Sequence, residues 1–495
     1  MTVEKTVLAR DLSHLFSDEA CRRKPSPIKT TMAYFQDPSV VFLGAGMPPS
    51  DIFPLRSISV EAPKPPFTNG LALCEDTIVA SLAKEHQDLT FDQDIPLARA
   101  LQYGNSRGQK ELLSFLKEHT KLFHNIPYQD WDIITTTGST QSWDASLRIF
   151  CNKGDTVLLE EYTYSSSVEA AEAQGLNCIP MAMDQEGIRP DRLEDLLANW
   201  TTYHPGIPMP KLLYTIPTGQ NPTGSTMSDS RKPHIYHLAQ KYDMIIIEDE
   251  PYYFLQMDAY LPENERDPDA NAENVSHASF MRSLCRSFLE LDTEGRVVRL
   301  DSVSKTFAPG CRLGWIVGSK QLLDTYWNLH EVSIQSTCGF AQSILSGILN
   351  RWGQDGYISW LKGLRQQYTT KRNWCLDNCS KFLPSQVVTV PRVSAGMFFM
   401  ILIDAQKHPD FQTTFKGDVK LLEPYIYQKC VSAGVLVACG SWFKVNGPDS
   451  SKLVQCDEES KTLIFRGTYA SVPPEAMVKG LQLLGNELRK EFKLE

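Results

Sequence analysis

The chain has 495 residues, of which 42% are hydrophobic and 22% are charged, and its formal net charge is −10 at pH 7. At roughly 100–200 residues per domain this length predicts two or three domains, and the composition excludes a disordered or collagen-like chain. The acidic balance argues against nucleic acid as the main partner, because that binding depends on Lys and Arg contacts with phosphate, whereas a small anionic ligand needs only a few local charges.

The first 50 residues are irregular and rich in proline, which is typical of an extended arm. From about residue 108 onward, helix and strand patterns alternate. We predict helices at 111–119, 141–150 and 234–241, and strands at 132–137, 156–160, 212–216, 244–248 and 297–300. Short apolar strands separated by helices indicate parallel strands that are buried on both faces, so the central region is expected to be an α/β domain.

From about residue 351 the pattern changes to a long helix at 360–378, strands at 396–403, 435–439 and 462–466, and a final helix from about Pro474. This order predicts a smaller α+β domain. Two polar stretches, 258–274 and 446–461, are expected to be solvated surface loops. The predicted fold class is therefore α/β, a large domain with a mostly parallel sheet between helices, joined to a smaller α+β domain and an N-terminal arm. We place the boundaries at 1–50, 51–350 and 351–495.

No segment has the length and apolarity of a membrane-spanning helix. The longest apolar run is 397–403, far shorter than the ~20 residues that a bilayer requires. The first 20 residues contain no apolar signal core, and the twelve cysteines include no Cys-x-x-Cys pair, as expected for reduced thiols. We therefore expect a cytoplasmic protein without a membrane partner.

Polar and aromatic residues follow five of the predicted strands, where ligands bind in open α/β sheets. A Gly-Ser-Thr turn follows the first, two tyrosines follow the second, and the others run into Pro-Thr-Gly-Gln-Asn-Pro-Thr-Gly, Asp-Glu-Pro-Tyr-Tyr and Asp-Ser-Val-Ser-Lys. Taken alone, each has an ordinary explanation, since a Gly-Ser-Thr turn is usually a helix cap and Asn-Pro-Thr-Gly is a common type of turn. Their joint occurrence at strand ends indicates a binding site.

Together these segments resemble the fold-type-I, pyridoxal-phosphate-dependent aminotransferases, and in particular the branch of kynurenine, 2-aminoadipate and fungal aromatic aminotransferases. The resemblance rests on Asn221-Pro222-Thr223-Gly224, Glu248-Asp249-Glu250-Pro251-Tyr252-Tyr253, Ser302-Val303-Ser304-Lys305, Arg312-Leu313-Gly314-Trp315 and Phe465-Arg466. It implies pyridoxal 5′-phosphate as cofactor and ping-pong transamination, through pyridoxamine phosphate, between amino acids and 2-oxo acids such as 2-oxoglutarate. The implied donors are aromatic amino acids, kynurenine and 2-aminoadipate, the last suggesting a place in lysine biosynthesis.

The resemblance implies catalytic roles for Lys305, Asp249 and Tyr252. Lys305 matches the lysine that forms an imine with the cofactor and moves the substrate α-proton, tasks suited to an amine whose pKa falls readily on burial. Asp249 matches the carboxylate that keeps the ring nitrogen protonated. Asn221 and Tyr252 match the two donors to the ring 3′-oxygen, and Tyr164 matches the aromatic residue that stacks on the ring.

A phosphate group needs several hydrogen-bond donors and a fixed cation. The residues that match this cup in the family are Ser139, Thr140, Ser302, Ser304 and Arg312. Tyr103 matches a tyrosine that family members supply from the neighbouring subunit, which implies a homodimer.

Arg466 matches the arginine that binds the substrate α-carboxylate, a task that suits its planar fork. Asn221, Gly46 and the N-terminal arm are expected to lie against the substrate. Lys29 stands where animal members have a mobile arginine in Pro-Ser-Pro-Ile-Arg, and a lysine can meet a distal carboxylate without that fork. The preference among aromatic residues, kynurenine and 2-aminoadipate therefore stays open.

Three other functions are weighed against transamination: a β-lyase, a cyclopropane-forming synthase and a transcription regulator. A β-lyase or a cyclopropane-forming synthase would use the same motifs, because proton abstraction comes first in each reaction. A transcription regulator with an aminotransferase-like domain would need a helix-turn-helix domain, for which the first 50 residues are too short and irregular. We expect no metal site, because His234 and His237 have no acidic or cysteine partner nearby in the sequence.

Overall fold

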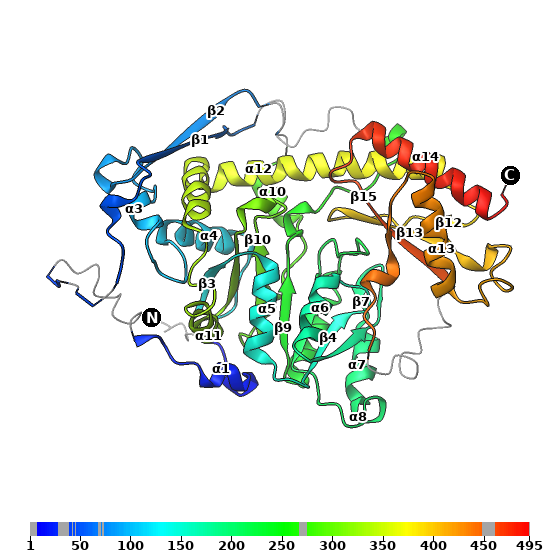
Figure 1. Ribbon diagram of the computed structural model, residues 1–495, viewed down its shortest axis with the longest axis horizontal. Helices are drawn as coiled ribbons and strands as arrows, with labels where there is room; N and C mark the ends of the chain where they lie inside the picture. Colours follow the sequence, from blue (N-terminus) through cyan, green and yellow to red (C-terminus); the bar gives the residue numbers. More distant parts are fainter. Residues whose placement is uncertain are drawn as a thin grey trace, which may run out of the picture.

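The computed structural model describes residues 7–27, 39–41, 43–44, 46–67, 71, 74–266, 275–447 and 461–494. A seven-stranded sheet flanked by helices forms the larger part of the molecule, and a four-stranded sheet with its own helices lies at one end of it (Figure 1). The α/β fold class that the sequence predicts is confirmed.

The large sheet has the strand order β3-β11-β10-β9-β8-β4-β5. Neighbouring strands from β10 to β5 are parallel, and β11 is antiparallel to both of its neighbours. The bounds are β3 (Trp131–Thr136), β4 (Thr156–Glu160), β5 (Asn177–Met181), β8 (Leu212–Thr215), β9 (Ile245–Asp249), β10 (Val297–Ser302) and β11 (Gly314–Ser319). Five of these seven strands were predicted from the sequence, with ends within two residues of those observed.

Helices cover both faces of this sheet (Figure 1). On one face, Trp143 of α5 packs against the Tyr214 ring and Ser167 of α6 donates a hydrogen bond to the Tyr214 hydroxyl. On the other face, Lys232 of α9 lies near Glu248 and Glu250. Among the described residues, the α-helices before residue 339 are α1 (Asp18–Arg22), α3 (Leu97–Ala100), α4 (Lys110–Phe123), α5 (Ser139–Phe150), α6 (Ser165–Ala173), α7 (Pro190–Ala198), α8 (Trp200–Tyr203), α9 (Lys232–Lys241), α10 (His277–Arg282) and α11 (Lys320–His330).

The four-stranded sheet is antiparallel, with the order β12-β13-β15-β14. Its buried side chains and those of the neighbouring helices form a second hydrophobic cluster. Its strands are β12 (Val388–Thr389), β13 (Phe398–Asp404), β14 (Ala438–Cys439) and β15 (Thr462–Thr468), and its helices are α13 (Val419–Ser432) and α14 (Pro474–Glu491). The element α12 (Gly339–Phe382) runs from α4 to α14 (Figure 1) and is interrupted at Gly353, where φ is 65°. The sequence predicted only its second part, because glycine lowers helix propensity before residue 357.

Two further strand pairs, which the sequence analysis did not predict, lie outside the main sheets: the hairpin β1 (Ser57–Pro63) and β2 (Thr77–Ala83), and the short pair β6 (Met183–Asp184) and β7 (Gly187–Ile188). The β1–β2 hairpin lies beside α12, where Trp352 Nε1 donates to the Pro63 carbonyl at 2.8 Å. Among the described residues, no helix is long and apolar enough to cross a membrane.

The irregular N-terminal region is attached to the large sheet and its helices rather than fully extended. The Ser17 amide donates to the Ile149 carbonyl at 2.7 Å, just before the short helix α1. The first polar stretch is also anchored, since the Tyr260 hydroxyl donates to Asp377 of α12 at 2.7 Å. The prediction of a purely solvated loop was therefore incomplete for 258–266, and residues 267–274 and 448–460 lie outside the described residues.

Candidate active site

The site lies at the carboxyl ends of β3, β8, β9 and β10, the edge where parallel sheets bind ligands. Asn221 follows β8, Asp249 ends β9 and Lys305 follows β10. From the smaller sheet, β15 brings Arg466, whose Nη1 donates to the Oδ1 atom of buried Asn221 at 2.7 Å. The two sheets are therefore joined by a hydrogen bond between two of the predicted site residues.

Asp249 is a buried carboxyl group with one oxygen paired and one unpaired. The Tyr214 hydroxyl donates to Oδ2 at 2.7 Å, whereas Oδ1 has no hydrogen-bond partner among the described residues. Burial raises the pKa of Asp249 to about 6, against the opposing effects of the Tyr214 hydrogen bond and of the nearby Ser139 hydroxyl. A buried acceptor without a partner is costly, so Oδ1 is suited to a donor from a bound ligand.

Tyr214 was missed by the sequence analysis, although it holds Asp249 in place. It is fully buried in β8, its hydroxyl accepts from Ser167 Oγ at 3.1 Å, and its ring centroid lies 4.4 Å from that of Trp143. A buried tyrosine usually has a polar partner for its hydroxyl, which was the available signal. The identity of that partner depends on which strands are neighbours, and the sequence does not show this.

Lys305 is half-buried, and burial together with the charge of Arg312 lowers the pKa of its amine. A lowered pKa increases the neutral fraction, the form that can act as a nucleophile or accept a proton. Tyr252 is buried, which raises the pKa of its hydroxyl, and the charges of Asp249 and Arg466 also act on that pKa. Lys305, Tyr252 and Asp249 thus come from the ends of two neighbouring strands.

An anion-binding cradle is formed at the start of α5. Its N-cap residue Gly138 has φ 111° and provides no side-chain cap, and the Ser139 hydroxyl is buried without a partner among the described residues. Arg312 donates from Nη2 to the Thr137 carbonyl at 2.9 Å. At this φ a residue with a side chain is strained, and a Cβ atom at position 138 would lie 2.9 Å from Arg312 Nη2, so glycine suits both the turn and the close approach of this guanidinium.

Three more of the predicted phosphate-binding residues lie around this cradle. Thr140 is exposed on the first turn of α5, and the Ser302 hydroxyl donates to Ser304 Oγ at 2.8 Å where β10 ends. A helix N-terminus, hydroxyl groups and a fixed guanidinium together form the kind of site that binds phosphate.

The guanidinium of Arg466 is held between two aromatic rings. Its Cζ lies 4.3 Å from the ring centroid of Phe398 and 4.5 Å from that of Phe443. Burial lowers the pKa of Arg466, although an arginine remains charged at neutral pH. The rings and Asn221 fix the plane of the guanidinium, as bidentate binding of a carboxylate requires.

The remaining predicted residues lie apart from this group or at its edge. Tyr164 stands at the N-cap position of α6 without a side-chain cap and is 37% exposed, and Tyr103 is 57% exposed. Gly46 is exposed, and apart from its chain neighbours no described atom lies within 4 Å of the position that its Cβ would take. Lys29 lies outside the described residues. Within the described part of the chain, no group of three or more His, Cys, Asp or Glu residues could hold a metal ion.

Pyridoxal phosphate fits the residues present. The unpaired Oδ1 of Asp249 suits a protonated ring nitrogen, the cradle at Gly138 and Arg312 suits the phosphate, and the half-buried amine of Lys305 suits covalent attachment to an aldehyde. A mostly parallel sheet with these groups at the carboxyl ends of its strands defines a pyridoxal-phosphate enzyme of fold type I.

The chain matches the family described as aminotransferase class I and II over residues 77–476, and it belongs to that family. It is 38% identical to an aromatic amino acid aminotransferase of Schizosaccharomyces pombe, over 98% of this chain and 99% of the relative. It is 31% identical to an L-tyrosine:2-oxoglutarate aminotransferase of Serpula lacrymans, over 99% and 98% of the two chains. The crystal structure of aminotransferase Aro8 from Candida albicans is similar, with a TM-score of 0.91, 45% identity and coverage of 99% of this chain and 100% of that one. The protein is an aminotransferase with pyridoxal phosphate as its cofactor.

Proposed function

We propose that this protein transfers amino groups from phenylalanine, tyrosine and tryptophan to 2-oxo acids such as 2-oxoglutarate. The observation that carries this proposal is the placement of Arg466 between Phe398 and Phe443, which puts a carboxylate-binding group beside apolar aromatic surface. An aromatic amino acid has both a carboxylate and a ring to match that surface. The names of the relatives from S. pombe and Serpula lacrymans support the same substrate class.

In this proposal the residues of the chain divide the work between binding and proton transfer. When bound, pyridoxal phosphate supplies an aldehyde that takes up an amino group and a ring that withdraws electrons from the substrate α-carbon. Asp249 keeps a proton on the ring nitrogen, and Asn221 and Tyr252 bind the ring 3′-oxygen. Lys305 holds the cofactor between turnovers and then carries the proton of the substrate α-carbon at Nζ.

The other residues bind and orient. Arg466 holds the α-carboxylate of both the amino acid and the 2-oxo acid, and Tyr164 lies against the cofactor ring. The phosphate group is bound by Ser139, Thr140, Ser302, Ser304 and Arg312. Because the same carboxylate site serves donor and acceptor, the two half-reactions proceed in the same pocket.

A panel of amino donors at fixed 2-oxoglutarate tests the substrate class. Phenylalanine, tyrosine or tryptophan should give glutamate, and no glutamate with any of the three would overturn the proposal. A β-lyase would instead release ammonia without a 2-oxo acid. Lys305→Ala should lose the cofactor adduct that borohydride fixes to the wild-type chain. If that adduct persists, another lysine is the attachment site.

We also propose that 2-aminoadipate and kynurenine are donors and that Gly46 and Lys29 lie near their side chains. The amine of Lys29 would meet the distal carboxylate of 2-aminoadipate. Lys29→Ala should raise the KM for 2-aminoadipate and leave phenylalanine unchanged. An equal loss on both substrates would mean that the arm has a structural role only.

We propose that the active unit is a cytoplasmic homodimer in which Tyr103 reaches the phosphate group of the neighbouring subunit. The exposure of Tyr103 in the single chain supports this arrangement. Mixing Lys305→Ala subunits with Tyr103→Ala subunits would then assemble one site with both residues intact. Activity should reappear in the mixture, whereas a Tyr103 that acts within its own chain would give no recovery.

We keep the domain division into an arm (1–50), a large cofactor-binding domain (51–350) and a small domain (351–495) as a proposal. The second hydrophobic cluster, which apart from Met257 contains only residues after 351, and the interruption of α12 at Gly353 support the second boundary.

A further inference from the structure

The loop that carries Asn221 is fastened to a buried carboxyl group that no part of the proposed function uses. Glu160 is the last residue of β4, next to β8 in the sheet, and its side chain is fully buried. Its Oε1 accepts from Thr215 Oγ1 at 2.6 Å, and its Oε2 accepts from the Ile216 amide at 3.2 Å and Gln220 Nε2 at 2.8 Å. All three donors lie just before Asn221 in the chain.

Gln220 connects Glu160 to the rest of the loop through its own hydrogen bonds. Its Oε1 accepts from the amide and the hydroxyl of Thr223 at 3.0 and 2.7 Å, and its Nε2 also donates to the Tyr162 carbonyl. Its backbone amide donates to the Ser225 carbonyl at 2.9 Å. The turn is therefore closed around Gln220, and Gln220 is held by Glu160. Asn221 is the next residue, so its carboxamide is placed by this turn.

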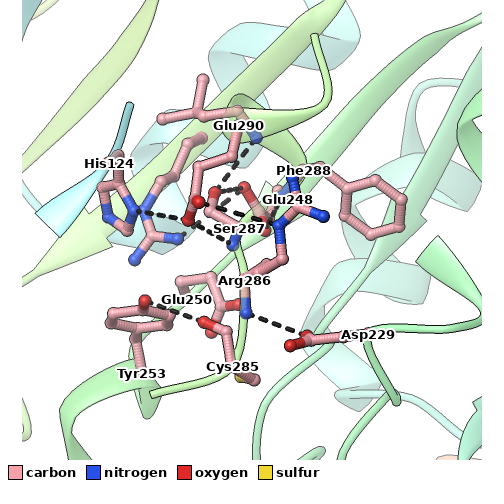
Figure 2. Close-up of polar contacts among 12 residues, drawn as sticks. His124, Asp229, Glu248, Glu250, Tyr253, Cys285, Arg286, Ser287, Phe288 and Glu290 are labelled. Atoms are coloured by element: carbon pink, nitrogen blue, oxygen red, sulfur yellow. Dashed lines mark hydrogen bonds and ion pairs between the residues drawn. The ribbon is translucent and has the colours of Figure 1, made fainter. Parts of the chain in front are cut away.

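A second buried carboxyl group touches the same loop in a different way and serves as a matched comparison. Glu250 lies just past β9, on the other side of β8, and accepts from Thr218 Oγ1 at 3.0 Å. Its Oε2 has no hydrogen-bond partner among the described residues, and it lies beside Tyr253 and Cys285 (Figure 2). Glu160 has three donors and Glu250 has one, so only Glu160 ties several points of the loop together.

The chemistry of the donors makes Glu160 hard to replace. A carboxylate accepts hydrogen bonds at both oxygens, whereas a glutamine would present an NH₂ group at one of them. With Gln in place of Glu160, an NH₂ group on the Oε2 side would leave the Ile216 amide and Gln220 Nε2 without an acceptor, and an NH₂ group on the Oε1 side would require the Thr215 hydroxyl to turn and accept instead of donate. Burial raises the pKa of both carboxyl groups; three hydrogen bonds oppose this rise at Glu160, whereas the charge of Arg299 opposes it at Glu250.

We propose that Glu160 is a positioning residue for transamination: through Gln220 it fixes the carboxamide of Asn221, which holds Arg466, and it thereby sets the affinity for the α-carboxylate of both substrates. This inference rests on the proposed roles of Asn221 and Arg466. Glu160 itself touches neither the substrate nor the cofactor in this arrangement and acts only through the loop.

The test compares Glu160→Gln with Glu250→Gln in the cofactor-loaded enzyme. For Glu160→Gln we expect the KM of the amino acid and that of the 2-oxo acid to rise together, by about tenfold, with a smaller fall in kcat. For Glu250→Gln we expect changes within about twofold, because Glu250 accepts a single hydrogen bond from this loop, from Thr218. A fall in kcat alone, or equal effects of both variants, would overturn the proposal.

A binding measurement separates positioning from general damage. The dissociation constant of 3-phenylpropionate, an aromatic carboxylate with no amino group to react, can be followed through the absorbance of the bound cofactor. It should rise about tenfold in Glu160→Gln and stay unchanged in Glu250→Gln. Unchanged binding in Glu160→Gln would refute the role, even if turnover is low. Because this binding measurement needs no turnover, its result is independent of the activity assay. Unchanged binding in Glu160→Gln would refute the role of Glu160 while wild-type transamination of tyrosine still stands, and absent transamination would refute the proposed activity while the binding result still stands.

A double-mutant cycle tests the route through Gln220, and its Gln220→Met arm alone covers the case in which Glu160→Gln folds poorly. Gln220→Met removes the amide that links Glu160 to the turn without changing charge. If the two residues act through one route, the double variant should bind 3-phenylpropionate about as weakly as the weaker single variant. Additive losses, or normal binding in Gln220→Met, would show that Glu160 does not act through this turn.

Discussion

In the protein freed of its cofactor, replacing Asp249 with Asn should raise thermal stability even though it removes a group needed for function. Asp249 is buried, one of its oxygens is unpaired among the described residues, and its pKa is raised from 3.8 to about 6. Above pH 6 the folded chain must carry a buried carboxylate charge with one oxygen lacking a partner among the described residues, whereas the unfolded chain carries the same charge in water. The cost of this group is therefore absent below pH 3.8, grows between pH 3.8 and 6, and is complete at higher pH.

The size of the effect follows from the pKa shift. A rise of about two pKa units corresponds to ~3 kcal/mol at pH 8, and linkage reduces the cost to about 1.5 kcal/mol at pH 5. The unfolding entropy of a 495-residue chain is on the order of 1 kcal/mol/K. Asp249→Asn should therefore raise the midpoint of thermal unfolding by about 3 °C at pH 8 and by about half as much at pH 5. The Tyr214 hydroxyl can still donate to the Asn carboxamide oxygen.

The measurement is a pair of thermal unfolding curves at pH 5 and pH 8, made on cofactor-free protein. Asp301→Asn is the matched control, because Asp301 lies one residue before the end of the neighbouring strand β10 but is paired with Arg299 at 2.9 and 3.0 Å. Breaking a buried ion pair costs about 3–5 kcal/mol, so this variant should be less stable than wild type. A midpoint for Asp249→Asn at or below that of wild type at pH 8 would refute the reasoning, as would a gain that is the same at both pH values.

Three other variants test the site in turn. Tyr214→Phe removes the hydrogen bond to Asp249, which is worth about 1.5–3 kcal/mol for a charged acceptor. The dissociation constant of pyridoxal phosphate should therefore rise by at least tenfold. An unchanged dissociation constant would exclude Tyr214 as a support of Asp249. Gly138→Ala places a methyl group against Arg312, so phosphate-dependent affinity for the cofactor should fall about tenfold, and pyridoxal without phosphate should bind as in wild type. Arg466→Lys keeps the charge but loses the fork, so the KM of both substrates should rise about tenfold; a change for only one of them would contradict a shared carboxylate site.

Much of the fold was predictable because its central strands are short, apolar and fully buried. This holds for β4, β9 and β10, whose residues are all buried. The strand β5 contains Pro180, which disfavours a strand in the interior of a sheet, and it was not predicted; in the structure it lies at the edge, where proline is tolerated. The strand β1 reads Ser-Ile-Ser-Val-Glu-Ala-Pro, an alternating pattern that the sequence prediction did not use.

Some residues of the candidate site could be predicted from the sequence, and others could not. Asn221, Asp249 and Lys305 could be singled out because each follows a predicted strand, and the carboxyl ends of parallel strands share one edge. Tyr214 and Glu160 could not, because their roles depend on the neighbours of β8. The strand order β9-β8-β4 brings together residues far apart in the sequence, and the chain order alone does not reveal it.

The hydrogen bond between Arg466 and Asn221 has a thermodynamic consequence. It joins a residue proposed to bind the substrate carboxylate to one proposed to bind the cofactor, and the two residues come from different sheets. If a bound cofactor that orders Asn221 raises the affinity of Arg466 for a carboxylate by some factor, then a bound carboxylate must raise the affinity for the cofactor by the same factor. Cofactor and substrate are then cooperative ligands, and the cofactor is released most readily when the carboxylate site is empty.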